Sequence, residues 1–558
     1  MKILVEEHIY SNIAQINEIC GNFDILNDNK VSKVGYFFNP SINDCVICLP
    51  KVIKDANGTT VLGGLSPENL IDVFSEDTDN KINETQKEFV QSFSLWSYRT
   101  ISTFHKLNPQ SSTVSYASST KDKIDENNTY GTLLDVIFAI VQFYNKNKDY
   151  LIYTIKNLHR GNDRINWRKT ISNKTPVFQD NVPIYIDAIN KRKQINFDEE
   201  LMIIFYSIIS YISKNLGIRI ITEYNYELIS GAQFEAYLEG LGLTRLKAIK
   251  YKYFSDKDIQ LWRLCYAFFE KTSQIEASNN IEDYLLVSDF NQVFESMIDV
   301  LISDKDLPDI LKNQEDGKIV DHIFRHNSPI DGQPIYYIGD SKYYSIGRNI
   351  EDKSLYKQFT YAKNIIQYHF ITKKRNKLES IRYRDNLTEG YNFTPNFFIS
   401  AYIPSELNYD STEIKERIFN DSKHRISHFE NRLFDRDTLW LTHFDVNLLF
   451  IMMLYAENDN NSQSSFKAEL KIKVFTSFQK ILTAKYDFYI ISPDKDIETF
   501  VNDNFKLLNG KIYTHAEGKL LLALEKDRQD SGKIHTVLQH NAKLALVTLP
   551  EITSSQAR

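Results

Sequence analysis

Cysteine is scarce in this sequence, with four residues in a chain of 558. So few thiols over such a length do not form a disulfide framework, so we expect them to be reduced. Cys45 and Cys48 form a single CxxC motif, but no further zinc ligands follow at a matching spacing. Residues three apart on a strand also point to opposite faces. We therefore expect both cysteines to pack in a core.

Long apolar runs and phosphate-binding glycine motifs are also missing. The longest apolar runs, LMIIFYSIISYI and LLFIMMLYA, fall short of the roughly 18–20 residues that a membrane span needs. The first residues, MKILVEEHIY, meet two acids after a very short apolar start, which is not typical of a signal peptide. No G-x-x-x-x-G-K-[ST] motif occurs. We expect a cytoplasmic protein without a membrane anchor that does not bind a nucleoside triphosphate through a Walker motif.

The composition indicates a folded chain with more than one core. Hydrophobic residues make up 42% and aromatic residues 13%, including 33 Tyr and 35 Phe. Single cores stop growing near roughly 250–300 residues, so we expect about three domains. The net charge of −7 does not indicate a nucleic-acid-binding protein, and it does not exclude a local basic surface.

Hydrophobic periodicity indicates a mixed α/β protein. Two β-rich runs flank NPSIND within 31–53 and predict a hairpin. Apolar periodicity predicts mostly helices over 130–250. From 283 onwards the order is helix, strand, strand, helix, strand, strand. The predicted regions are an N-terminal β-containing module for recognition or partner docking (1–125), a mostly helical region (126–280), a catalytic core (281–465) and a C-terminal α/β extension (466–558).

The stretch YYIGDSKYYS places two opposite charges in an aromatic, β-forming context. Asp340 and Lys342 are two residues apart, so they share one face of a strand. If the preceding turn is centred on Ile330 and Asp331, Asp321 falls opposite Asp340. Two adjacent carboxylates repel, and a divalent cation that binds both removes this penalty. Mg²⁺, or Mn²⁺, suits such carboxylate ligands, and a nearby lysine can activate water or stabilise charge on a phosphate.

Helices on either side of this hairpin supply further candidates. Glu295, in the preceding helix, is expected to reach the metal together with Asp321 and Asp340. Gln358 and Tyr361 share one face of the following helix. Gln358 is a candidate to orient the lysine, and Tyr361 to contact the DNA backbone.

Other interpretations of these residues remain open. A D-x-K triplet is common by chance and is usually a surface ion pair. A literal Pro-Asp at Asp309 is an alternative first metal ligand, although Asp321 is favoured. His322 and His326 flank the hairpin, where such residues most often lie on the surface.

A basic loop is predicted at 159–175, HRGNDRINWRKTISNKT. Basic residues next to a tryptophan are typical of segments that contact phosphates and stack on bases. A solvated loop anchored by a buried Trp fits the composition equally well. The candidate DNA-binding residues in the loop are Arg164, Asn166, Trp167, Arg168 and Lys169.

The order Glu295, Asp321, Asp340-x-Lys342 and Gln358 resembles the PD-(D/E)xK nuclease core. Several sequence segments are also similar to the LlaJI family of restriction endonucleases, which are McrC-like. These segments are VSKVGYFF…VICLPK, NDRINWRKTI, IGDSKYY with YKQFTYAKN, and THFDVNLLFIMMLYA. The residue before Asp321 is Val320, where the motif has proline.

This resemblance implies a Mg²⁺-dependent DNA endonuclease subunit of a bacterial restriction and antiviral defence system. It also implies a partner, an McrB-type AAA+ GTPase, and double-stranded DNA as the substrate. Two alternatives stay open. One is a stand-alone type II restriction endonuclease, and the other is a nuclease fold that serves as a non-catalytic DNA-binding or scaffold subunit.

Overall fold

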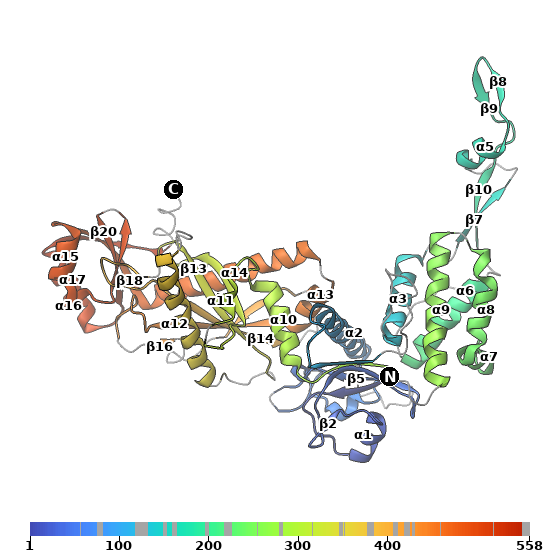
Figure 1. Ribbon diagram of the computed structural model, residues 1–558, viewed down its shortest axis with the longest axis horizontal. Helices are drawn as coiled ribbons and strands as arrows, with labels where there is room; N and C mark the ends of the chain where they lie inside the picture. The colour runs from blue at the N-terminus through green and yellow to red at the C-terminus, as the bar shows by residue number, and fades with distance from the viewer. Residues whose placement is uncertain are drawn as a thin grey trace.

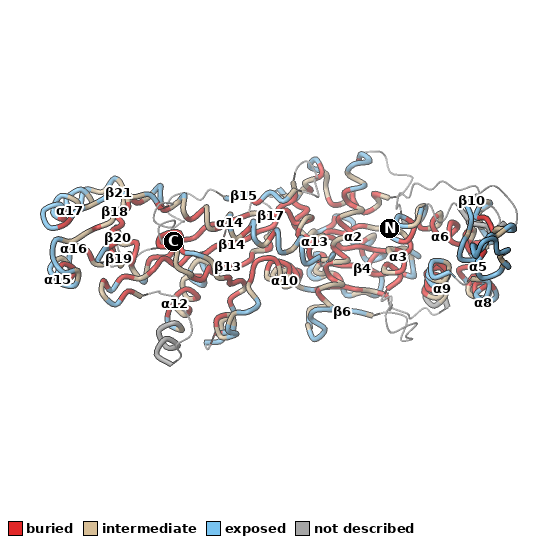
Figure 2. Tube along the Cα trace, turned by 90° about the horizontal axis from the view of Figure 1, so that it is seen from above, coloured by how far each residue is buried: buried red, intermediate tan, exposed pale blue. Residues whose placement is uncertain are grey.

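The protein is an elongated series of units in a mixed α/β architecture, as the computed structural model shows (Figure 1). Buried segments follow the length of the molecule, and both of its ends are more exposed (Figure 2). Among the residues described, no helix combines the length and apolar character that a membrane span requires. The structure describes residues 1–549 except 56, 75–81, 118–131, 149–152, 159–163, 196–199, 217–225, 254, 278–282, 315, 345–349, 351, 376–383, 405–410, 418–424, 427–429, 458 and 517.

A five-stranded sheet with a helix on each face forms the N-terminal unit. Its elements are β1 (Lys2–Val5), α1 (Ile13–Cys20), β2 (Leu26–Asn27), β3 (Lys30–Val31), β4 (Val34–Asn39), β5 (Asp44–Leu49), η1 (Lys51–Ile53), η2 (Pro67–Leu70), α2 (Glu84–Leu107), β6 (Val114–Ala117) and β11 (Tyr284–Val287). The strand order is β1-β5-β4-β11-β6, and the predicted hairpin is present as β4 and β5. Cys45 packs in the core that contains α2, and Cys48 packs in the core that contains α1, because they lie on opposite faces of β5.

A helical unit is inserted between β6 and β11. Its elements are α3 (Leu133–Lys146), α6 (Glu200–Leu216), α7 (Ala232–Ala236), η3 (Tyr237–Leu241), α8 (Gly242–Ile249), η4 (Lys250–Lys252) and α9 (Asp256–Ala277). The chain leaves the N-terminal sheet after β6 and returns to it as β11, which pairs directly with β6. Residues 284–287, which lie inside the predicted 281–465 range, therefore belong to the N-terminal sheet.

A narrow arm projects from the helical unit, away from the rest of the molecule (Figure 1). Its elements are β7 (Tyr153–Leu158), α5 (Trp167–Asn173), β8 (Val177–Gln179), β9 (Val182–Ile184) and β10 (Asn190–Ile195). The prediction of a loop over 159–175 was wrong for the part that the structure describes, since α5 lies there. Asn166 caps α5, because its side chain accepts a hydrogen bond from the Lys169 amide at 3.4 Å.

A six-stranded sheet organises the next unit. Its elements are α10 (Phe290–Ile302), α11 (Asp309–Lys312), β12 (His322–Asn327), β13 (Pro334–Lys342), α12 (Asp352–Arg375), β14 (Pro395–Tyr402), β15 (Ile414–Glu416), β16 (Arg425–Ile426), β17 (Leu439–Asn447), α13 (Leu448–Glu457) and α14 (Asn460–Lys485). β12 is antiparallel to β13, whereas β13, β14 and β17 run parallel. α12 is the crossover between β13 and β14, the helical connection that parallel neighbours require.

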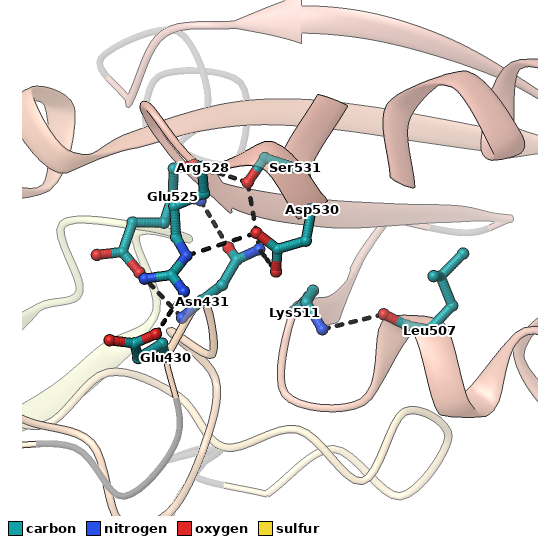
Figure 3. Close-up of polar contacts among 8 residues, drawn as sticks. All are labelled: Glu430, Asn431, Leu507, Lys511, Glu525, Arg528, Asp530 and Ser531. Atoms are coloured by element: carbon teal, nitrogen blue, oxygen red, sulfur yellow. Dashed lines mark hydrogen bonds and ion pairs between the residues drawn. The ribbon is translucent and has the colours of Figure 1, made fainter. Parts of the chain in front are cut away.

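A four-stranded antiparallel sheet with three helices forms the C-terminal unit. Its elements are β18 (Tyr486–Pro493), α15 (Ile497–Asp503), α16 (Phe505–Leu508), β19 (Ile512–Ala516), β20 (Lys519–Glu525), α17 (Gln529–Gln539) and β21 (Ala542–Val547). Polar contacts join this unit to the residues after β16 (Figure 3). The fully buried Asn431 exchanges two hydrogen bonds with Glu525, at 2.9 and 2.7 Å, and its amide also donates to Asp530.

Candidate active site

The β12–β13 hairpin brings Asp321 beside Asp340. The ladder pairs His322 with Gly339, so Asp321, the residue before β12, stands opposite Asp340. The Ser341 amide donates a hydrogen bond to Asp321 Oδ2 at 3.3 Å. This is the register predicted from a turn centred on Ile330 and Asp331. The hairpin therefore places two carboxylates at the same end of neighbouring strands.

Gly339 lets β13 pack closely against the neighbouring strand just before the charged residues. A Cβ atom at this position would lie 2.3 Å from the ring of Phe397 on β14. No side chain tolerates such a contact without movement of that ring. The glycine ahead of Asp340 therefore sets the packing of the strand that carries the candidate site.

The Asp340 carboxylate is buried but electrostatically compensated. Its side chain is 1% exposed, and it forms an ion pair with Lys342, two residues along the same strand. Lys357 Nζ lies 3.8 Å from Asp340 Oδ1. Neither carboxylate oxygen of Asp340 accepts a hydrogen bond within the part of the chain that the structure describes. The charge is thus balanced by the ammonium groups of Lys342 and Lys357.

Lys357, in the first half of α12, is a site residue that sequence reasoning missed. Burial alone would lower its pKa, but the Tyr361 hydroxyl and the carboxylates of Asp321 and Asp340 together raise it. The Lys357 ammonium also lies 5.3 Å from the centre of the Tyr361 ring. Its spacing from Tyr361, one helical turn along α12, was the available signal. This lysine stays protonated beside the two carboxylates.

The two remaining carboxyl groups resist ionisation. Burial raises the pKa of Asp321 to about 9, and the neighbouring Asp340 and Glu295 add to this effect, while Lys357 opposes it. Burial also raises the pKa of Glu295, which lies on α10. The Asn291 amide, which donates to Glu295 Oε1 at 2.6 Å, partly offsets that shift. Adjacent acids with raised pKa values are typical of functional sites.

α12 carries two buried polar side chains, Gln358 and Tyr361. Gln358 is fully buried, and neither its amide nitrogen nor its oxygen has a hydrogen-bond partner among the described residues. Tyr361 is also fully buried, and its pKa is raised by burial although Lys357 lowers it. The charges of Asp321 and Asp340 also act on Tyr361, which places this hydroxyl near the two carboxyl groups.

The residues fit a divalent cation that binds through two protein carboxylates. The described residues contain no group of three His, Cys, Asp or Glu side chains placed to hold a metal ion, so Glu295 does not complete such a cluster with Asp321 and Asp340. Mg²⁺ commonly takes only one or two carboxylates and fills its other positions with water and substrate phosphate. Two carboxyl groups held side by side, with the pKa of Asp321 raised by burial and by Asp340, fit a pair of ligands to one cation.

The other candidates near the hairpin lie elsewhere or serve as structural groups. Asp309 begins α11, where its side chain accepts a hydrogen bond from Asn313 at 2.6 Å. His322 is fully buried, which corrects the expectation of a surface histidine, and Asp299 Oδ1 lies 3.5 Å from its Nδ1. His326 is partly buried, and burial lowers its pKa.

The basic DNA-binding candidates are not brought to this site. They lie at the start of α5 in the arm, at the other end of the molecule from α12 and β13 (Figure 1). Trp167 is 55% exposed and meets Tyr185 edge to face with ring centres 6.3 Å apart, so the expectation of a buried anchor does not hold. The set consists of Arg164, Asn166, Trp167, Arg168 and Lys169.

Comparison with known proteins gives one structural similarity. No family model and no curated protein matches the chain. A solved chain from an assembly of Thermococcus gammatolerans McrB AAA+ hexamers with bound McrC matches with 11% sequence identity and a TM-score of 0.24. The match covers 84% of this chain and 99% of that one.

Proposed function

We propose that this protein is a Mg²⁺-dependent endodeoxyribonuclease, the DNA-cleaving subunit of a bacterial restriction and antiviral defence system. One observation carries the proposal: the β12–β13 hairpin aligns Asp321 with Asp340, and Lys342 pairs with Asp340. The order of these residues along the chain also matches the PD-(D/E)xK pattern. The proposal includes Mg²⁺ or Mn²⁺ as the cofactor and double-stranded DNA as the substrate.

The protein side chains have separate roles in this proposal. Asp321 and Asp340 would hold the cation, which when bound would polarise the scissile phosphate and lower the pKa of an attacking water. Lys342 lies beside Asp340, where its ammonium orients that water and stabilises charge on the phosphate. Tyr361 on α12 lies near the two carboxyl groups, and Gln358, one residue after Lys357, is proposed to orient the lysine; Glu295 adds negative charge from α10.

The ion pair between Asp340 and Lys342 must open or loosen when a cation binds. At present Lys342 occupies the position that best neutralises the Asp340 carboxylate. Released from Asp340, the Lys342 ammonium would be available to an incoming phosphate. Lys342 is 14% exposed and lies at the end of β13, so this movement needs only a change of side-chain rotamer.

An McrB-type AAA+ GTPase is the proposed partner, because the sequence resemblance implies this division of labour. The chain itself contains no Walker motif. The N-terminal and helical units and the arm offer large surfaces that the cleavage site does not use (Figure 1). Such a partner would supply nucleotide hydrolysis to the complex.

Plasmid cleavage in Mg²⁺ tests the proposal. Wild-type protein and the Lys342→Ala variant are compared with and without the GTPase and GTP, with Lys318→Ala as a charge-matched surface control. We expect Lys342→Ala to lose about 10²-fold or more of the cleavage rate and Lys318→Ala to lose none. Equal cleavage by Lys342→Ala and wild type would remove this lysine from the mechanism. Cleavage without a partner or nucleotide would favour a stand-alone enzyme, and no cleavage in any combination would favour a scaffold subunit.

A further inference from the structure

A cavity of about 680 Å³ lies in the helical unit, where α8 and η4 turn into α9. It is far from the cleavage site, since α8 and α9 lie at the opposite end of the molecule from α12 and β13 in both views (Figures 1 and 2). Its volume is within the range of small-molecule sites. Any function of this cavity is therefore separate from the chemistry at Asp340.

The α9 side of the cavity is one face of that helix. Ile259, Trp262, Arg263 and Tyr266 recur at the spacing that places residues on a single helical face. The Trp262 and Tyr266 rings stack with centres 5.0 Å apart and planes 22° from parallel. The Trp262 indole donates to the Leu246 carbonyl at 2.7 Å, which anchors the stack against α8. The wall is therefore a fixed aromatic surface.

The opposite side supplies cations. Lys250 Nζ lies 5.0 Å from the centre of the Trp262 ring, and Lys247 Nζ lies 5.9 Å from the centre of the Tyr266 ring. Neither lysine has a carboxylate partner among the residues that the structure describes, and no acidic side chain lines the cavity. Arg263 adds a third cationic side chain. This concave, positively charged wall favours an anion.

Tyr251 extends the aromatic wall to the surface. It lines the cavity, yet it is 81% exposed, and it makes no ring contact with any described residue. A large aromatic side chain held in solvent next to lysines has one ring face available for stacking. Lysines interleaved with aromatic rings are the combination that binds a nucleotide, because cations hold phosphate and rings stack on the base.

From this arrangement we propose that the cavity binds a nucleoside phosphate, with the phosphate on Lys247 and Lys250 and the base stacked on Tyr251. An acidic peptide would satisfy the lysines but would leave the aromatic surface unused. The same chemistry is presented by a free nucleotide and by one unit of single-stranded DNA. The test separates these two sources.

The test measures binding of fluorescein-labelled oligodeoxythymidine to the full-length protein by fluorescence anisotropy. EDTA is present, so that no metal-dependent cleavage takes place. The variants are Tyr251→Ala, which alters only an exposed ring, and Lys247→Ala/Lys250→Ala. Lys252→Ala is the matched control, because Lys252 also lies in η4 but pairs with Glu200 at 3.7 Å and does not line the cavity. Unlabelled dTMP, AMP and polyglutamate serve as competitors.

We expect Tyr251→Ala to weaken binding about ten-fold or more, the usual effect of losing one stacked base. The double lysine variant should weaken it as well and reduce the slope of affinity against salt by roughly two. Competition by the mononucleotides would show that a free nucleotide is sufficient to fill the cavity. Binding of the oligomer without such competition would identify single-stranded DNA as the ligand. Either result supports the proposal.

Three results would overturn it. The first is the absence of binding by oligodeoxythymidine and by both mononucleotides. The second is an equal loss in Lys252→Ala, which would indicate general charge attraction. The third is competition by polyglutamate as strong as that by nucleotide, which would indicate an acidic protein partner. None of these results bears on cleavage at Asp340, so this inference and the proposed nuclease function can fail separately.

Discussion

At the scale of single residues, the hairpin site resists a second negative charge beside Asp340. Asp340 is buried against two ammonium groups, while Asp321 keeps a pKa of about 9 because of burial and its acidic neighbours. Such a cluster costs stability when its acids are ionised and gains stability from a bound cation. Two predictions follow from this imbalance, one about pH and one about Lys357.

Asp321 should make the metal-free protein less stable as the pH rises. Its pKa is about 9 in the folded protein, against roughly 3.9 in an unfolded chain, so the folded state binds the extra proton between these values. The stabilising effect is fully present below about pH 4 and is lost as the pH rises toward 9. In EDTA, Asp321→Asn should therefore have an increasingly higher Tm than wild type over this range.

Thermal unfolding across this pH range, with and without Mg²⁺, measures the effect. Mg²⁺ should raise the Tm of wild type and leave that of Asp321→Asn nearly unchanged. Asp309→Asn, the same substitution at an exposed position in α11, is the matched control. A Tm difference for Asp321→Asn that stays constant between pH 4 and 9 would contradict the raised pKa.

Lys357 should contribute to cleavage almost as strongly as Lys342. Lys357→Met keeps the aliphatic stem but removes the ammonium that faces Asp340 at 3.8 Å. We expect the rate of plasmid cleavage to fall by about 10²-fold, because a preorganised charge next to the reacting phosphate is lost. Lys353→Met, at an exposed position one turn earlier on α12, is the control. If both variants cleave at the same rate, Lys357 serves only in packing.

At the scale of elements, the hairpin was predictable and its surroundings were not. The turn residues and the β-rich runs in 318–345 define the register that pairs His322 with Gly339. The role of Lys357 depends on the rotation of α12 relative to β13, which one sequence does not specify. Likewise, β11 pairs with β4, which lies about 250 positions earlier in the chain. A local sequence pattern does not predict which distant strand a strand pairs with. Local signals thus gave the site, and long-range packing determined what surrounds it.

Gly339 tests how tightly β13 is held against β14. Gly339→Ala would place a methyl group 2.3 Å from the Phe397 ring, so we expect a loss of about 1–3 kcal/mol in the free energy of unfolding. Gly532→Ala is the same substitution in α17, where no atom lies within 4 Å, and it should stabilise by about 0.5–1 kcal/mol. Urea unfolding of the two variants measures both values. A loss below about 0.5 kcal/mol for Gly339→Ala would mean that Phe397 moves aside easily.

At the scale of the whole molecule, the candidate site is attached to the N-terminal unit through the residue that follows Lys342. Tyr343 packs against Phe290 and Phe294 of α10. Its hydroxyl donates to the buried Glu6 at 2.5 Å and accepts from the Lys51 amide at 2.9 Å. The Lys51 amide also donates to Glu6 at 2.9 Å, which closes a buried triangle of hydrogen bonds. The end of β13 and the end of β1 therefore share one polar contact.

Tyr343→Phe should loosen both units at once, because it removes the hydroxyl and keeps the ring. Burial raises the pKa of Glu6 although Lys51 opposes this, so the carboxyl group depends on its few partners. Loss of one of them should cost about 1–3 kcal/mol. Hydrogen–deuterium exchange followed by mass spectrometry should then show faster exchange in β1 and in β13 together. Tyr356→Phe, on the exposed face of α12, should change neither strand.

In a double-mutant cycle of Tyr343→Phe with Glu6→Gln, the two losses in the free energy of unfolding should be less than additive, since both substitutions weaken the same contact. Faster exchange in only one of the two strands would show that the N-terminal unit and the candidate site are held independently.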